Sequence, residues 1–266
     1  MDGDSEKEES SRAYEKFQKD PDYLNTVSNK IKLTDFILSL GTGDLIFSRS
    51  DTVTGHLIQF SGHCIWNHVA VCISTMNESN GPYWCEATNT VYENDELARG
   101  GVKIWNIKDR FDEMFKKEPD TFFIFGVSYL KKKEPSKKEE QKLVSFLKKE
   151  KGKPYQDAYS VLFFSWFDGF SSIKNTCCCY STQAVRDDMD KQPLYAINKN
   201  DTSKYFCSEL VAEALVQSGI MKMKKNGKIL PSSEWDVAKL ADTVLLNNNL
   251  NNNFYYTEIV FYYVYA

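Results

Sequence analysis

The middle of the chain is built from short apolar segments separated by turn-forming residues. Strand-like segments begin at "LIF" in "GTGDLIFSRS" and continue at "NHVAVCIS" (67–74), "PYWCEATN" (82–89), "GVKIWNI" (101–107) and "TFFIFGV" (121–127). Stretches such as "NESNGP" and "ENDELARGG" lie between them and carry the residues typical of turns. This spacing predicts a meander or a small barrel of strands.

Two later segments have the periodicity of amphipathic helices. Residues 135–152 predict a helix in which Ser136 and Glu139 form a capping box and Gly152 ends the helix. Residues 205–219, "YFCSELVAEALVQSG", predict a second helix that also ends at a glycine. The apolar face of the helix 205–219 must be buried, so we expect it to pack against the strands, whereas the balanced lysines and glutamates of 135–152 predict a solvated helix face.

The C-terminal third changes character several times. The stretch "ILPSSEWDVAKLAD" predicts a turn and a short helix, and the asparagine-rich stretch 247–253 predicts a surface loop. The final "FYYTEIVFYYVYA" is rich in aromatic and β-branched residues and predicts a closing strand. Because such a strand would favour aggregation if it were unpaired, we expect it inside the sheet.

The same patterns divide the chain into three parts. Residues 1–12 are acidic and polar without apolar periodicity, which predicts a disordered tail. Residues 13–40 carry spaced apolar positions, which predict an N-terminal helical extension of one or two helices with a break at Pro21. Residues 41–266 form the main domain, in which the segment 158–204 is an insertion or lid of unassigned secondary structure.

Composition narrows the class of protein. The chain has 266 residues, of which 42% are apolar and 26% charged, a mixture typical of globular domains with a sizeable core. A formal net charge of −4 gives no electrostatic signature of nucleic-acid binding. Without an apolar signal segment or a run of about 18 apolar residues, we expect a cytoplasmic protein. Its seven cysteines are then expected to be reduced thiols.

Cys207 lies near the start of the predicted helix 205–219 and is a candidate nucleophile. A thiol in the first turn meets the positive end of the helix dipole and free backbone N–H groups, which favour the thiolate and could hold an oxyanion. The residue shares a helix face with Leu210 and Val211, and the polar residues 200–204 offer N-cap candidates. The alternative is that Cys207 packs as a small hydrophobic residue.

A nucleophilic cysteine needs a base, and the chain has three histidines. The strand period places His68 on one face with Ala70 and Cys72, whose small side chains leave room for a helix to approach closely. His56 and His63 lie in a polar stretch with nearby glycines, which predicts positions on the surface or at the rim of a cleft. The alternative for His68 is a half-buried histidine with satisfied hydrogen bonds.

Glu86 is an acidic residue within an apolar strand. A buried carboxylate is costly unless it is paired, and orienting His68 would supply a partner. A cysteine–histidine pair generally needs a third group of this kind. The alternative is a glutamate on an edge strand that faces water.

Taken together, these features resemble the permuted papain-like (NlpC-type) thiol hydrolases and acyltransferases, above all the YiiX-like group and more distantly the lecithin:retinol acyltransferase group. The matching motifs, in order, are "GDLIF", "NHVAV", "CEA", "GKPYQDAY", "FCSELV" and "LP", and they span roughly residues 41–240. In ordinary papain-like enzymes the cysteine precedes the histidine, whereas here His68 precedes Cys207. That reversal is the permuted order.

The resemblance implies an α+β fold in which an antiparallel sheet or small barrel packs against the helix carrying the cysteine. It implies Cys207 as nucleophile, His68 as base and Glu86 as the orienting residue. The expected reaction is attack on an amide or ester carbonyl of a peptide, lipid or lipidated protein, through a thioester, without a cofactor or a metal. The insertion 158–204 departs from the pattern and leaves the substrate open.

Other readings of the chain remain open. One is a catalytically inactive module on the same fold, which uses the aromatic and cysteine-rich insertion as a surface for a partner or a membrane. The triplet Cys177, Cys178 and Cys179 could instead bind a metal with a histidine, but adjacent cysteines converge poorly on one tetrahedral centre. S-acylation of the triplet, with peripheral membrane attachment, is a further alternative.

Overall fold

The structure is a computed structural model, and some segments of the chain fall outside its description. It describes residues 8–20, 22–49, 55–56, 58–59, 64–74, 81–88, 100–117, 123–132, 137–155, 205–222 and 236–265, without the side chains of 8–13, 113–114 and 116–117. The predicted insertion 158–204, with its cysteine triplet, lies outside these residues. So do His63, Ser136 of the predicted capping box, and the "LP" motif.

A seven-stranded sheet forms the centre of the described structure, in the order β1-β9-β6-β2-β3-β4-β5. Its strands are β1 (Asn29–Lys32), β2 (Leu45–Ser48), β3 (His68–Ile73), β4 (Tyr83–Thr88), β5 (Gly101–Asn106), β6 (Phe123–Ser128) and β9 (Val260–Tyr265). β1 runs parallel to β9, and the other neighbours are antiparallel. A second, two-stranded sheet pairs β7 (Leu130–Lys132) with β8 (Phe254–Tyr256). The predicted α+β class with a largely antiparallel sheet is confirmed.

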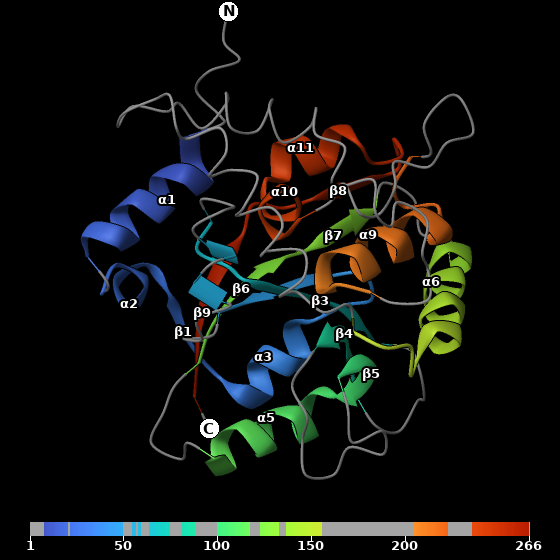
Figure 1. Cartoon of the computed structure of the whole chain (residues 1–266), viewed down its shortest axis with the longest axis horizontal. Helices are drawn as coiled ribbons and strands as arrows, with labels where there is room; N and C mark the ends of the chain where they lie inside the picture. Colours follow the sequence, from blue (N-terminus) through green and yellow to red (C-terminus); the bar gives the residue numbers. More distant parts are fainter. Residues whose placement is uncertain are drawn as a thin grey trace, which may run out of the picture.

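Helices cover both faces of the large sheet (Figure 1). On one face lie α1 (Glu8–Lys19), α2 (Tyr23–Val27), α6 (Lys137–Glu150), α9 (Cys207–Ser218), α10 (Val237–Ala241) and α11 (Thr243–Asn248). On the other face lie α3 (Leu33–Ser39) and α5 (Ile107–Lys117). Because both faces are covered, the central strands are almost continuously apolar. This is why the sequence predicts β2 to β6 correctly.

The N-terminal part of the chain differs from its prediction. α1 begins at Glu8, so residues 8–12, which were expected in a disordered tail, are helical. The segment 13–40 was expected to be a helical extension, yet it also supplies β1 at the edge of the large sheet. β1 has four residues and two of them are lysines, a short and charged edge of the kind that resists pairing with other chains. Phe36 of α3 is completely buried against the same sheet.

The C-terminal part also differs in detail. The final apolar stretch forms two strands rather than one, and β9 lies inside the sheet between β1 and β6, as expected. The asparagine-rich stretch is not a plain surface loop, because α11 extends into it and Leu250 is buried. The Asn247 side chain donates to the carbonyl of Tyr256 at 2.9 Å and accepts from its N–H at 2.6 Å. Asparagine amides therefore connect this stretch to β8.

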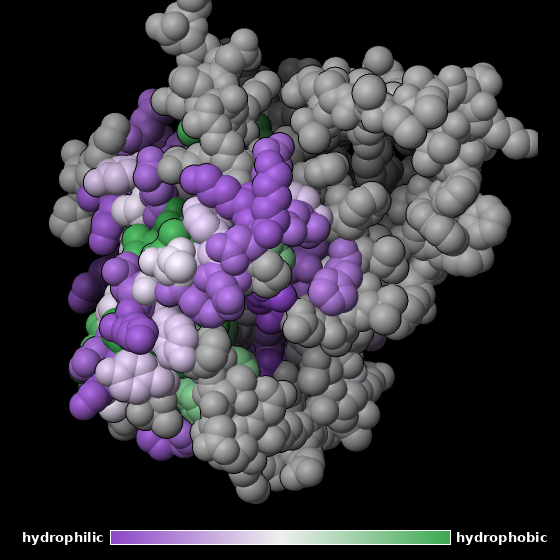
Figure 2. Space-filling view, turned by 90° about the vertical axis from the view of Figure 1, so that its left-hand side faces the viewer, coloured by the Kyte–Doolittle hydropathy of each residue, from purple (hydrophilic) through white to green (hydrophobic). Residues whose placement is uncertain are grey.

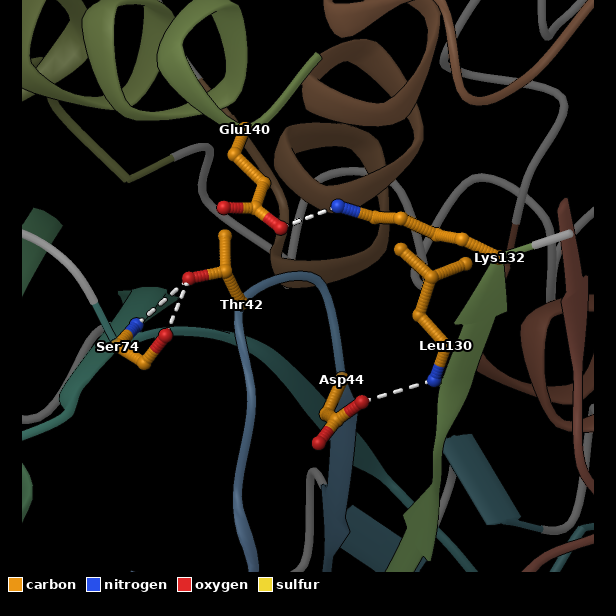
Figure 3. A network of polar contacts seen from close by, with 6 residues as sticks. All are labelled: Thr42, Asp44, Ser74, Leu130, Lys132 and Glu140. Atoms are coloured by element: carbon orange, nitrogen blue, oxygen red, sulfur yellow. Dashed lines mark hydrogen bonds and ion pairs between the residues drawn. The ribbon is translucent and has the colours of Figure 1, made fainter. Parts of the chain in front are cut away.

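A polar network holds the turn that enters β2 (Figure 3). The carboxylate of Asp44 accepts the N–H of Gly41 at 2.6 Å and the N–H of Leu130, in β7, at 2.8 Å. Beside it, the hydroxyl of Thr42 accepts the N–H of Ser74 at 2.9 Å. Burial raises the pKa of Asp44 to about 6, although these backbone donors and Lys131 oppose the rise. The network connects the two sheets.

Figure 2 turns the left-hand side of Figure 1 towards the viewer and shows that the described part of this face is mostly hydrophilic, with small separate apolar patches. Within the described part of the chain, no helix combines the length and the apolar character needed to cross a bilayer.

Candidate active site

The helix that carries the candidate nucleophile begins at the cysteine itself. Phe206 is the N-cap residue, in an extended conformation, and its N–H donates to the carboxylate of Glu209 at 3.0 Å. The first helical hydrogen bond runs from the N–H of Leu210 to the carbonyl of Phe206 at 3.0 Å. The prediction of an N-cap within residues 200–204 is therefore wrong. Cys207 is the first residue of α9, with the orphan N–H groups of the first turn around it.

α9 packs on the opposite face of β3 from the one expected. Leu210 and Val211 belong to the same core as Val69 and Val71, whereas Ala70 lies in the core on the other side of the sheet. The small residues beside His68 do not receive the helix. Cys207 nevertheless meets His68, because each is the first residue of its element and the two element ends come together.

The imidazole of His68 lies between two side chains from different elements. Its Nε2 donates to the Oε2 atom of Glu86, in β4, across 2.6 Å. Cys207 lies close enough to the same ring for its charge and its hydrogen-bonding capacity to raise the pKa of His68. Because Nε2 is occupied by Glu86, Nδ1 is the ring nitrogen left for the thiol. The three residues predicted from the sequence are thus brought together.

Burial and charge act against each other at this ring. Burial by itself lowers the pKa of His68, but Cys207 and Glu86 outweigh it and raise the pKa to about 10. Burial also raises the pKa of Glu86, but the charges of Arg110 and His68 outweigh it and hold the pKa at about 2. The site therefore favours a protonated His68 beside an ionised Glu86 at neutral pH.

Arg110 is a residue of this site that the sequence reading missed. It projects from α5, is 8% exposed, and places its Nε atom 3.5 Å from the Oε1 atom of Glu86. The helix was not predicted, although Ile107, Phe111 and Phe115 recur at the four-residue interval of a helix face. That interval was the available signal.

Of the other candidate residues, the structure describes only His56. His56 is exposed in a short helical stretch, and His63 lies outside the described residues. Cys177, Cys178 and Cys179 also lie outside them, so their metal-binding and acylation readings stay predictions. Among the residues that the structure describes, no group of three or more His, Cys, Asp or Glu side chains is arranged to hold a metal ion.

Comparisons with known proteins give a structural likeness but no sequence match. No protein-family model matches the chain, and no curated protein matches it by sequence. Among solved structures, it resembles the crystal structure of the metalloprotein yiiX from Escherichia coli O157:H7, with 18% sequence identity and a TM-score of 0.39. The alignment covers 83% of this chain and 87% of that chain. At this level of similarity the neighbour assigns neither a fold family nor an activity to this chain.

Proposed function

We propose that this protein is a cysteine-dependent hydrolase or acyltransferase of the permuted papain-like type, acting on an amide or ester bond. Cys207 is the nucleophile, His68 is the base, and Glu86 orients the base. The observation that carries the proposal is that a thiol at a helix start and a buried carboxylate converge on one imidazole. This is the arrangement that nucleophilic catalysis by cysteine requires.

In the first half of the reaction, the proton of the Cys207 thiol resides on Nδ1 of His68, and the thiolate attacks the carbonyl carbon of the substrate. A C–S bond forms while the carbonyl electron pair moves onto oxygen, where the backbone N–H of Cys207 can stabilise it. When the tetrahedral intermediate collapses, the bond to the amine or alcohol breaks. His68 gives that leaving group its proton, and a thioester remains on Cys207.

In the second half, His68 removes a proton from water or from an acceptor amine or alcohol, which then attacks the thioester. The C–S bond breaks and its electron pair stays on the sulfur, which leaves the Cys207 thiolate beside a protonated His68, as at the start. Glu86 remains ionised throughout and keeps Nε2 protonated, which directs Nδ1 towards the sulfur. Peptide amides, lipid esters and lipidated protein segments all carry a carbonyl that suits this chemistry.

One observation favours a second candidate function. Cys207 is 4% exposed, so a substrate carbonyl can reach the sulfur only if neighbouring groups move. In this alternative the protein is an inactive binding module in which Cys207 is a packing residue. The insertion 158–204 then provides the surface for a partner or a membrane.

The test is the rate at which each cysteine is alkylated as a function of pH, read by mass spectrometry of the full chain. Cys72 and Cys85 serve as internal controls, because both are buried and burial raises the pKa of each thiol. We expect Cys207 to react far faster than these two near pH 6, and to lose that advantage in His68→Ala. If Cys207 is unreactive, or if its alkylation rate is unchanged in His68→Ala, the enzyme hypothesis is refuted and the binding-module hypothesis takes its place.

A second experiment asks what the thiolate attacks. Wild-type protein is incubated with a panel of aryl esters, lipid esters and peptide amides, and the intact mass is followed for an acyl adduct on Cys207 that hydroxylamine removes. Cys207→Ala is the control and should show neither adduct nor turnover. Turnover that survives this substitution would assign the activity to other residues.

A further inference from the structure

The carboxylate of Glu86 has two oxygens, and only one of them is used by His68. Oε2 accepts the hydrogen bond from His68, while Oε1 faces Arg110, whose Nε atom is 3.5 Å away. The glutamate is 1% exposed and the arginine side chain 10% exposed, so water screens this pair little. Two buried groups of opposite charge therefore meet directly behind the base.

Arg110 reaches this place from an element of its own. It lies on α5, which covers the face of the sheet opposite α9. The carboxylate of Glu86 therefore lies between Arg110 on α5 and His68 at the start of β3. Other groups also face Glu86. Lys103 is its cross-strand partner on β5 and is buried, and the indole of Trp84, two residues away on the same face of β4, favours its charged form.

Arg110 meets Glu86 as an ion pair through Nε, without a hydrogen bond between Nε and Oε1. This attraction favours the orientation of the carboxylate in which Oε1 faces Arg110 and Oε2 faces His68. A carboxylate free to rotate would not maintain a 2.6 Å hydrogen bond to one ring nitrogen. Without that hydrogen bond, the ring would lose the orientation that directs Nδ1 towards Cys207.

We propose that Arg110 is a positioning residue for the candidate active site: from α5 it holds Glu86 in the orientation in which Glu86 directs His68 towards Cys207. The inference rests on the proposed function for its catalytic meaning. Its structural content is the restraint of Glu86 and of the His68 ring, which can be measured whether or not the protein is an enzyme.

The test follows two NMR signals in the full-length protein labelled with ¹³C-glutamate and ¹⁵N-histidine. The first is the carboxyl carbon of Glu86, assigned by its loss in Glu86→Gln. The second is the downfield proton of the His68 Nε2–H group that donates to Glu86. In Arg110→Met we expect the pKa of Glu86 to rise by about 1 to 3, because the neighbouring cation is gone. We also expect the Nε2–H resonance to move upfield or broaden.

Three further variants separate position from charge. Arg110→Lys retains the charge but not the Nε atom that faces Oε1, so Glu86 should remain ionised to low pH while the Nε2–H resonance still changes. Lys108→Met removes a cation from an exposed position on the same helix and should change neither signal. Lys103→Met tests the other buried cation near Glu86, and we expect a smaller effect on the Nε2–H resonance than in Arg110→Met.

The outcomes keep the two proposals apart. If both signals in Arg110→Met match those of the wild type, or only Lys103→Met changes them, the positioning role is refuted. If Arg110→Met does not fold, a wild-type Nε2–H resonance in Arg110→Lys refutes it instead. If the signals change as expected while wild-type Cys207 resists alkylation, Arg110 positions the pair and the proposed enzyme function fails. If both hold, the alkylation rate of Cys207 in Arg110→Met should fall about tenfold or more.

Discussion

Replacing Glu86 by glutamine removes a buried negative charge while retaining the shape of the side chain. The carboxyl has an ordinary pKa of 4.5 and a pKa of about 2 in the folded protein, where Arg110 and His68 stabilise its charged form against the cost of burial. At about 1.4 kcal/mol for each pKa unit, the difference amounts to about 3 kcal/mol of folding stability. Glu86→Gln should therefore lower the free energy of unfolding by about this much at pH 7. The loss of the buried counter-charge of Arg110 acts in the same direction.

The pH dependence of this loss has a definite sign. Because folding lowers the pKa of Glu86, its ionisation contributes stability that is fully present above pH 4.5 and disappears as the pH falls through about 2. The stability difference between the wild type and Glu86→Gln should thus be greatest near neutrality and fall to less than half by about pH 3. A histidine or lysine with a raised pKa would give the opposite trend.

Urea denaturation at several pH values between 3 and 7 measures this difference. The matched control is Glu140→Gln, which removes a carboxylate from a more exposed ion pair with Lys132 and should cost less than about 1 kcal/mol (Figure 3). The electrostatic argument would be refuted if Glu86→Gln cost no more than this control. A loss that stays constant between pH 3 and pH 7 would refute it equally.

Three other outcomes follow from the structure. The pKa of Asp44 is raised from 3.8 to about 6, so the stability of the wild type relative to Asp44→Asn should fall by about 2 kcal/mol as the pH rises from 4 to 7, measured by urea denaturation. Gly43 has a φ of 93° and a Cβ there would clash with Leu130, so Gly43→Ala should lose about 1 to 3 kcal/mol, measured by thermal unfolding. Tyr205→Phe removes the hydroxyl that donates to the buried carboxylate of Glu150 at 2.9 Å, so the free energy of unfolding should fall by about 1 to 3 kcal/mol. The alkylation rate of Cys207 in the same variant shows whether this hydrogen bond also affects the candidate site.

The sequence predicts the centre of the sheet well and its edges poorly. β2 to β6 are apolar runs between turn residues because helices cover both of their faces, and such runs are conspicuous. β1 has four residues, most of them exposed, and it owes its strand conformation to pairing with β9 at the far end of the chain. Pairing between segments that distant leaves no local pattern, so the same residues read equally well as part of a helix.

Parts of the candidate site could also be predicted from the sequence and parts could not. Cys207, His68 and Glu86 could be found because each carries a chemical group that is unusual in its local pattern: a thiol at a helix start, an imidazole in a strand and a carboxylate in an apolar strand. The face on which α9 packs could not be found, because alternation distinguishes two faces of β3 and both are buried. Arg110 was missed since an arginine on an amphipathic helix ordinarily faces water.

The buried charges around His68 are hard to explain by stability alone. Ion pairs in a protein interior can often be replaced by apolar residues of similar volume at little or no cost, because desolvation offsets most of their attraction. Here Glu86 lies in a central strand and Arg110 lies on the helix α5 that covers it, and the surrounding side chains belong mainly to two apolar cores. A leucine and a methionine would suit that environment. Oε2 of this carboxylate meets the imidazole beside Cys207, so the proposed need for an ionised, oriented acceptor at that imidazole would explain why these two charges are buried here.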